Sequence, residues 1–269
     1  MTSLALENVG FVYPDGTRAL NGVDLAIAQG ELVAVIGQNG SGKSTMVRHL
    51  DGLLRPTEGR VLHDGADIAD ERVAALAARV GIVFQNPDRQ IFAGRVRAEV
   101  EFGPRILGRA PAEAAAAGAK ALEAVGLTAS IDANPYDLGY SSRKLLTLAS
   151  ILAVDTPVVI LDEPTTGQDA RGMARIQRVI ADLTAAGRTV IAISHDMRFV
   201  AETFDRIVVM SAGRIVLDGP PAVVFAPESW PTLASTYLDA PLAGQVGARL
   251  GLGSTPTEAS LVEAVSARG

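Results

Sequence analysis

A glycine-rich segment that directly follows a short apolar run constrains this chain more than any other part of its sequence. Residues 37–45 read GQNGSGKST, and they follow the apolar run Leu32–Ile36. This order matches the pattern G-x-x-x-x-G-K-[ST], in which a strand leads into a phosphate-binding loop and then into a helix. The segment therefore predicts a strand, a loop and a helix that begins near Lys43, and it predicts a nucleoside triphosphate as the ligand.

The residue types in this loop suit phosphate chemistry. Glycines let the backbone turn tightly enough for successive N–H groups to point at phosphate oxygens, and the following helix adds the positive end of its dipole. Lys43 is expected to reach the β- and γ-phosphates, and the Ser44 hydroxyl is expected to bind magnesium. The residues predicted to contact the triphosphate are Gly37, Asn39, Gly40, Ser41, Gly42, Lys43, Ser44 and Thr45. A glycine-rich turn with a surface lysine is the alternative, and the order of the motif argues against it.

Length and composition indicate a globular protein with a sizeable core. The chain has 269 residues, of which 48% are hydrophobic, so it can form one large domain or one domain with an appendage. Its longest apolar stretch, Leu145–Val154, has about half the length that a membrane-spanning helix needs. The chain has no cysteine and no apolar signal core, which favours a cytoplasmic setting. Its net charge of −6 and its scattered basic residues argue against nucleic acid as a partner.

Short β-rich runs alternate with helical segments after residue 43, which predicts an α/β fold with a mainly parallel central sheet. The nearly continuous apolar character of the runs 33–36, 158–161 and 190–193 is typical of strands buried on both faces. Phosphate-handling residues should therefore lie at the carboxyl ends of these strands. The expected strands are residues 4–12, 23–27, 32–36, 80–84, 158–161, 189–193, 207–210 and 215–217.

The remaining segments predict helices. Residues 86–153 form a mostly helical subdomain, in which one helix should begin at Pro111 and end at Gly126. Repeated prolines after Gly219 should break the last 50 residues into short helices. We therefore expect a nucleotide-binding domain over residues 1–219, which begins with antiparallel strands, and a helical C-terminal extension over residues 220–269.

A second motif supplies acidic groups for the phosphate site. Residues 158–164 read VVILDEP, a buried strand that ends in two adjacent carboxylates. Asp162 is predicted to hold magnesium through water, and Glu163 to orient and polarise the water that attacks the γ-phosphate. The alternative is that the two acids are simply solvated at the end of a buried strand. The phosphate-binding loop upstream argues against this alternative.

Two polar residues should reach the same edge of the sheet. His195 follows the strand 189–193 and Ser194, so it is predicted to donate a hydrogen bond to the γ-phosphate. A lone histidine at a strand end is more often a capping or surface residue, and the order of the motifs favours the functional role. Gln85 ends the strand 80–84 and is predicted to contact magnesium or the attacking water.

These motifs together resemble the nucleotide-binding subunits of ATP-binding cassette (ABC) transporters over about residues 4–220. The resemblance implies an ABC ATPase fold with ATP and Mg²⁺ as cofactors. It also implies that Tyr13 stacks on adenine, that Gln85 belongs to the loop that senses the membrane partner, that Asp169 lies in a loop at a dimer interface, and that His195 is the switch histidine. For Tyr13, an aromatic residue that closes a β-ribbon is the alternative.

More narrowly, the segments QNPDRQIF at 85–92 and VEFGP at 100–104 resemble the ATPases of energy-coupling factor (ECF) transporters, which import vitamins or transition-metal ions such as cobalt and nickel. This resemblance implies an ATP-hydrolysing motor at the cytoplasmic face of the membrane. Its expected partners are a second ABC ATPase, a transmembrane coupling protein and a substrate-binding membrane protein.

One segment departs from the family. Leu138 aligns with the start of the family signature LSGGQ, and this chain reads LGYSSRKLL from that residue. In the family this segment opens a helix that caps the γ-phosphate bound on the opposite subunit. Tyr140 stands where a glycine is usual and should crowd that phosphate, although Ser141 or Ser142 remains open as a substitute hydroxyl. We therefore favour a heterodimer, in which a partner supplies an intact signature, over a homodimer.

Two other functions compete with a transporter motor. A soluble ABC ATPase that acts on DNA or ribosomes should show a long coiled-coil insertion, paired cassettes or a basic patch, and the sequence has none of these. A regulatory ATP-binding module with weak turnover is the second alternative, which the altered signature keeps open.

Overall fold

The computed structural model describes residues 3–268, which form two compact units. We call residues 3–70 together with 191–268 the phosphate-loop unit, and residues 71–190 the helical unit. The chain passes from one unit to the other after Asp70 and again within strand β8 (Thr189–Ile193). Along residues 3–268, no helix combines the length and the apolar character that a bilayer span requires.

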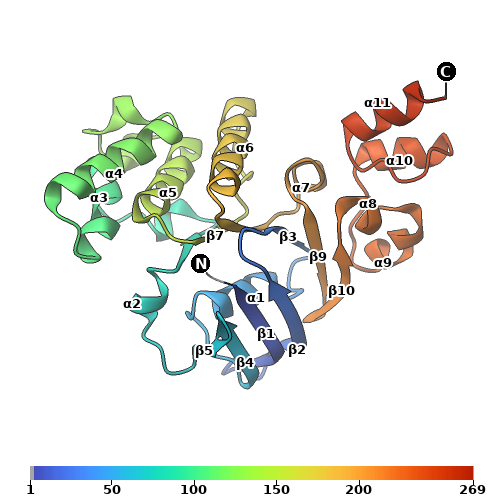
Figure 1. The fold of residues 1–269 in the computed structure, drawn as a ribbon, viewed down its shortest axis with the longest axis horizontal. Coiled ribbons are helices and arrows are strands. Elements are labelled where there is room, and N and C mark those ends of the chain that lie inside the picture. The colour runs from blue at the N-terminus through green and yellow to red at the C-terminus, as the bar shows by residue number, and fades with distance from the viewer. Residues whose placement is uncertain (1–2, 269) are drawn as a thin grey trace. The chain divides into compact units, whose positions relative to one another are not determined.

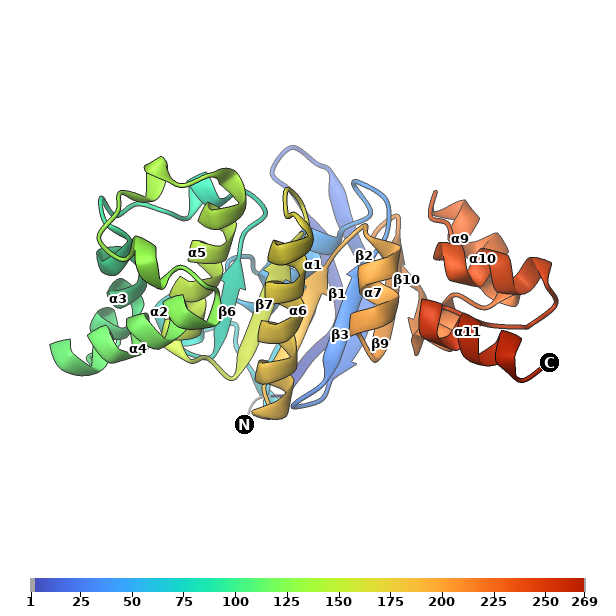
Figure 2. The same ribbon diagram turned by 90° about the horizontal axis from the view of Figure 1, so that it is seen from above.

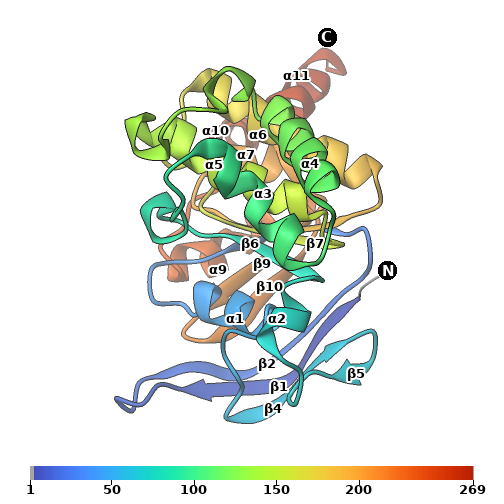
Figure 3. The same cartoon turned by 90° about the vertical axis from the view of Figure 1, so that its left-hand side faces the viewer.

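The phosphate-loop unit begins with an antiparallel sheet in the strand order β2-β1-β4-β5. Figure 3 shows β1, β2 and β4 side by side. In β2, buried Val23, Leu25 and Ile27 alternate with exposed or partly exposed neighbours, which is the pattern of a strand with one face on the core. The strands are β1 (Leu4–Val12), β2 (Arg18–Ile27), β4 (Glu58–His63) and β5 (Ala66–Asp67).

A second group of strands in this unit consists of β3 (Leu32–Ile36), which directly precedes the glycine-rich loop, and of β9 (Arg206–Ser211) and β10 (Arg214–Gly219), which come later in the chain. β3 pairs in parallel with β9, which pairs antiparallel with β10. Every residue of β3 is buried, as expected for a strand covered on both faces. Helix α1 (Lys43–Leu50) follows β3, and helix α7 (Met197–Thr203) follows β8.

The C-terminal part of the phosphate-loop unit consists of short helices, as the prolines predict. Figure 2 shows α9, α10 and α11 grouped together. Helix α8 contacts β9 and β10, and buried Val224 and Phe225 anchor this region. The helices are α8 (Pro221–Val224), α9 (Trp230–Ser235), α10 (Leu242–Arg249) and α11 (Glu258–Ser266), with a 3₁₀ turn at Pro227–Ser229.

The helical unit contains a parallel pair of strands, β6 and β7, and a set of packed helices (Figure 1). Helices α3, α4 and α5 contact one another. Gly118 of α4 permits this packing because a Cβ there would lie 2.8 Å from Val100 Cγ2 of α3. The elements are α2 (Val73–Leu76), β6 (Val80–Val83), α3 (Val96–Ile106), α4 (Pro111–Ala124), α5 (Tyr140–Val154), β7 (Val158–Asp162) and α6 (Ala170–Ala185), with 3₁₀ turns at Pro87–Arg89, Thr128–Ser130 and Pro135–Asp137.

The structure confirms the predicted α/β class, with parallel strands, an antiparallel N-terminal sheet, a helical segment and short C-terminal helices. Helix α4 begins at Pro111 and ends just before Gly126, which has a φ of +70°. Strand β2 begins earlier than predicted, at Arg18, because Arg18 and Leu20 pair with β1 although the segment RALNG has no clear strand pattern of its own. Strands β4 and β5 were not predicted.

Candidate functional site

The glycine-rich loop lies between β3 and α1, and its first glycine cannot be replaced without strain. Gly37 has a φ of +150°, and a Cβ there would lie 2.7 Å from Ser41 Oγ and nearer still to the carbonyl oxygen of Met210. The loop backbone therefore passes directly over the end of β9. Asn39 and Gly40 are exposed at its tip.

The polar groups of the loop suit an anion. Gly42 is the N-cap of α1 with a φ of 104°, and as a glycine it has no side chain to cap the N–H groups of the first turn. Lys43 is buried, and its Nζ donates to the carbonyl oxygens of Gly37 (2.6 Å) and Gln38 (2.9 Å). Ser41 Oγ is buried and has no hydrogen-bond partner among residues 3–268. Its position in the predicted loop fits a hydroxyl that a phosphate oxygen would satisfy.

Tyr13 is tied to the same helix. Its hydroxyl lies 2.9 Å from Thr45 Oγ1, and its ring packs edge-on against Phe11 with 4.9 Å between the centroids. Phe11 in turn packs edge-on against His49 of α1. The structure thus brings Tyr13 to Thr45, one of the residues predicted to contact the triphosphate. Stacking on adenine remains a prediction.

The two predicted acids lie together at the end of β7 in the helical unit. Asp162 and Glu163 are both buried. Glu163 has a φ of +52°, in the left-handed region that a residue other than glycine adopts at a cost of about 1–3 kcal/mol. Such strain persists only where the surrounding structure fixes the backbone, and it concentrates at functional sites.

A buried lysine that the sequence analysis missed fixes this backbone. Lys144 of α5 donates from Nζ to the carbonyl oxygens of Glu163 and of Thr166, the latter at 3.2 Å. Burial lowers the pKa of Lys144 to about 8, against the opposing effect of the Glu163 and Asp162 charges. The signal in the sequence was a lysine followed by two leucines in a predicted helical segment, because a lysine buried among apolar residues requires partners.

Gln85 lies just after β6 and is exposed, and its neighbours form an ordered segment. The Asn86 side chain accepts from the N–H of Asp88 at 2.9 Å. The buried carboxylate of Glu99 accepts from the N–H groups of Phe92 (3.1 Å) and Ala93 (2.8 Å), and burial raises its pKa. The segment 85–92 is therefore held at both ends by side-chain hydrogen bonds to backbone N–H groups.

His195 is exposed in the turn between β8 and α7. The N-cap of α7 is Asp196, whose carboxylate accepts from the N–H of Phe199 at 3.0 Å, so His195 does not cap this helix. Asp169 caps α6 in the same way and accepts from the N–H of Gly172 at 2.7 Å. The roles predicted for His195 and Asp169 are compatible with these positions and stay predictions.

The altered signature opens α5, as the resemblance implied for this segment. Gly139 is the N-cap, and as a glycine it has no side chain to cap the first turn. Ser141 Oγ donates to Gln168 Oε1 at 2.7 Å, so one of the two possible substitute hydroxyls is engaged within its own chain. Tyr140 is 38% exposed.

Each unit carries part of the predicted site. The phosphate-loop unit contains Tyr13, residues 37–45 and His195, and the helical unit contains Gln85, Asp162 and Glu163. For magnesium, the predicted donors are the Ser44 hydroxyl, the Asp162 carboxylate and the Gln85 amide oxygen. Such oxygens suit Mg²⁺, which usually binds one or two carboxylates together with water and substrate phosphates. Among residues 3–268, no group of three or more histidine, cysteine, aspartate or glutamate side chains is placed to hold a metal ion.

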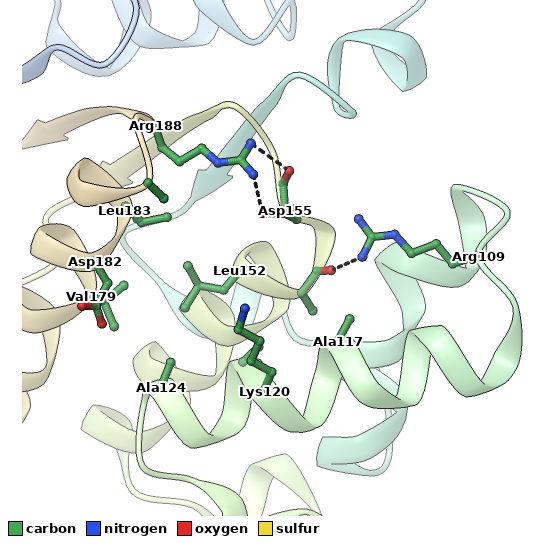
Figure 4. Close-up of a pocket in the computed structure, with 13 residues that line it drawn as sticks. Arg109, Ala117, Lys120, Ala124, Leu152, Asp155, Val179, Asp182, Leu183 and Arg188 are labelled. Carbon is green, nitrogen blue, oxygen red and sulfur yellow. Dashed lines mark hydrogen bonds and ion pairs between the residues drawn. The ribbon is translucent and has the colours of Figure 1, made fainter. Parts of the chain in front are cut away.

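The helical unit also contains a cavity of about 470 Å³ between α4, α5 and α6 (Figure 4). Its two arginines are engaged by the end of α5. Arg188 pairs with Asp155 at 2.8 Å, and Arg109 donates to the carbonyl oxygen of Val154 at 2.7 Å. None of the predicted site residues lines this cavity, so it is separate from the nucleotide motifs.

A family model described as ABC transporter matches residues 20–166, more than half of the chain. The chain belongs to this family. The energy-coupling factor transporter ATP-binding protein EcfA2 of Clostridium perfringens is 41% identical over 232 residues, which cover 83% of this chain and 81% of that protein. EcfA of Methanothermobacter thermautotrophicus is 39% identical over 82% of this chain and 72% of its own length.

Two solved structures share the fold. One is cbiO1 of Clostridium perfringens, described as part of the ABC transporter complex cbiONQ, with a TM-score of 0.76, 34% identity and coverage of 86% of this chain and 94% of that one. The other is a dimeric ATP-binding cassette in a post-hydrolysis state with ADP and Pi, with a TM-score of 0.74, 27% identity and coverage of 81% and 98%. The protein is therefore an ATP-binding ABC ATPase, and its relatives support a role as an ATP-driven transport motor.

Proposed function

We propose that this ABC ATPase is the motor subunit of an ECF-type importer, which couples ATP hydrolysis to the uptake of a vitamin or a transition-metal ion. The observation that carries the proposal is its similarity, at 39–41% identity over about four fifths of the chain, to several proteins named as ECF transporter ATP-binding proteins. The subunit would bind at the cytoplasmic face of the membrane through a transmembrane coupling protein and a substrate-binding membrane protein.

In this function the loop N–H groups, Lys43 and the Ser41 hydroxyl bind the phosphates of ATP. Ser44, Asp162 and Gln85 would hold Mg²⁺, which neutralises charge on the β- and γ-phosphates. Glu163 orients the attacking water and accepts its proton, and His195 donates a hydrogen bond to the γ-phosphate. The strained backbone at Glu163 supports this assignment, because strain of that kind concentrates where a side chain must be held in one orientation.

Within the helical unit, the segment 85–92 and helix α3 offer a surface for a membrane partner. Phe92 and Phe102 are 61% and 46% exposed and pack edge-on with 4.6 Å between their ring centroids. Ile106 and Leu107, at the end of α3 and just after it, are also exposed. Neighbouring exposed apolar side chains of this kind are typical of a protein interface. Docking here would pass movement of the partner to Gln85 along an ordered segment.

The proposal is tested by uptake in the host cell. Deleting the gene for this chain should abolish uptake of one member of a panel of radiolabelled vitamins, Co²⁺ and Ni²⁺. The wild-type gene should restore uptake, whereas Glu163→Gln and Phe92→Ser should not. Val262→Ser, which changes an exposed apolar residue of α11, is the matched control and should restore uptake. Unchanged uptake of the whole panel after deletion would exclude the proposed function.

We further propose that the subunit works as a heterodimer with a second ABC ATPase. Tyr140 would face the ATP bound by the partner, and the partner's intact signature would complete the site that contains Lys43 and Glu163. In a single-turnover assay of the assembled complex, Glu163→Gln should lower hydrolysis about 100-fold or more while ATP still binds. If hydrolysis stays near wild type and the equivalent change in the partner abolishes it, the active and weakened sites are the reverse of our assignment.

A further inference from the structure

The side chain of Tyr140 covers a glycine of the loop that follows Glu163. Gly167 has a φ of +74°, and a Cβ built on it would lie 2.7 Å from both Cδ1 and Cε1 of the tyrosine ring. The ring therefore lies directly against the Gly167 backbone. No side chain larger than that of glycine fits at residue 167 while the ring is there.

The next residue of the signature segment binds the same loop. Ser141 Oγ donates to Gln168 Oε1 at 2.7 Å, and Gln168 Nε2 donates back to the Ser141 carbonyl oxygen at 3.3 Å. These two reciprocal hydrogen bonds and the ring contact hold the far end of the loop 163–168. Lys144, one turn further along α5, holds the start and the middle of the loop through the carbonyl oxygens of Glu163 and Thr166.

The other side of the signature segment is fastened to the segment 85–92. The Arg143 guanidinium lies 2.9 Å from the Asp88 carboxylate, and the Tyr140 hydroxyl lies 3.4 Å from the Gln85 carbonyl oxygen. The second contact is long for an O–H donor. The packing of the Tyr140 ring, rather than its hydroxyl, therefore supplies most of the stabilising contact that this residue makes.

We propose that Tyr140 and Ser141 are positioning residues that clamp the loop 163–168 of their own chain and thereby hold Glu163 in its strained conformation. This inference rests on the role of Glu163 in the proposed function. The altered signature then has a role within its own subunit, through Tyr140 and Ser141, as well as facing the partner. In Tyr140→Gly no ring would cover Gly167, so the loop 163–168 would be more mobile. The Glu163 carboxylate would then be held less often in the orientation that hydrolysis requires.

The clamp and simple crowding predict opposite effects of Tyr140→Gly. If Tyr140 only crowds the phosphate bound by the opposite subunit, glycine should relieve the crowding and raise turnover. If Tyr140 clamps its own loop, glycine should lower kcat and leave the KM for ATP nearly unchanged, because the phosphate-binding loop is a separate segment. Tyr140→Phe keeps the ring and should behave like the wild type.

The test combines hydrogen exchange on the purified full chain with steady-state ATP hydrolysis by the complex of this chain with its partner ATPase. The amide groups to follow are those of Thr166 and Gln168, which donate within the loop to Glu163 (3.3 Å) and Thr165 (3.1 Å). In Tyr140→Gly their exchange should rise about tenfold and kcat should fall about tenfold. Tyr237→Gly, at an exposed tyrosine with a φ of +56°, is the control and should change neither.

Ser141→Ala provides a second, milder variant should Tyr140→Gly fail to fold. It should raise exchange at Gln168 and lower kcat by a smaller factor. Unchanged exchange in both variants, or a rise in kcat for Tyr140→Gly, would overturn the clamp, as would Tyr140→Phe behaving like Tyr140→Gly. If Glu163→Gln still hydrolyses ATP, the role of Glu163 is wrong, whereas the exchange of residues 166 and 168 still decides whether the clamp exists.

Discussion

The carboxyl group of Asp51 makes the phosphate-loop unit less stable at neutral pH than it would be with a neutral side chain there. Asp51 is 4% exposed and directly follows α1, where the negative end of the helix dipole disfavours an anion. Oδ1 accepts from the N–H of Leu53 at 2.8 Å, and Oδ2 has no hydrogen-bond partner among residues 3–268. Burial raises the pKa of Asp51 to about 6, and the Leu53 hydrogen bond and the charge of Arg48 oppose this.

The cost follows from the shift in pKa. The value rises from 3.8 to about 6. Each unit is about 1.4 kcal/mol, so ionised Asp51 costs about 3 kcal/mol. Because the pKa is higher in the folded protein than in the unfolded chain, stability falls as the pH rises through this range, and the full cost is present above about pH 6. The substitution Asp51→Asn removes this charge and keeps an acceptor for the N–H of Leu53.

Asp51→Asn should therefore raise the Tm, and the gain should be larger at pH 8 than at pH 5. The difference between the two gains should be about 1.4 kcal/mol, or roughly 3–6 °C for a chain of this size. Differential scanning fluorimetry at both pH values measures it. Asp70→Asn, at an exposed position, controls for removing one negative charge. An equal gain at pH 5 and pH 8, or a lower Tm at pH 8, would refute the reasoning.

Two further predictions concern the nucleotide motifs. Gly37→Ala should abolish binding of a fluorescent ATP analogue, because a Cβ there meets Ser41 Oγ and the Met210 carbonyl oxygen at a φ of +150°; retained binding would contradict the close approach of the loop to β9. The urea midpoint of Lys144→Met should fall relative to that of the wild type as the pH rises from 8 to 10. The lysine has a lowered pKa of about 8, so burial of its charge is costly at pH 8 and that cost disappears as it deprotonates. A difference in midpoint that does not change with pH would count against a buried, charged lysine.

Segments with a strong local pattern could be predicted from the sequence. Strand β3, the loop and α1 follow one another without interruption, so a single stretch of sequence specifies all three. Strand β8 is apolar at nearly every position, which reveals burial on both faces. Helix α4 carries its own start and stop signals in Pro111 and Gly126.

Features that depend on distant partners could not be predicted. Strand β4 begins with exposed Glu58, Gly59 and Arg60, and Gly59 has a φ of +77°, so its own sequence does not resemble a strand. Its pairing with β1, which includes the ion pair of Arg60 with Glu7 at 2.6 Å, supplies the stability instead. The contact of Tyr140 with Gly167 joins the start of α5 to the loop after β7, and no periodicity in either segment predicts it.

The glycines of the helical unit determine how that unit responds to a mechanical load. A Cβ at Gly103 would meet the Val154 side chain of α5, and a Cβ at Gly118 would meet Val100, so α3 lies nearly in backbone contact with its neighbours. Close-packed interiors of this kind compress very little. A force applied to α3 at exposed Phe102 would therefore move α3, α4 and α5 together as one rigid group. Because α5 begins at Tyr140, the signature segment would move with them.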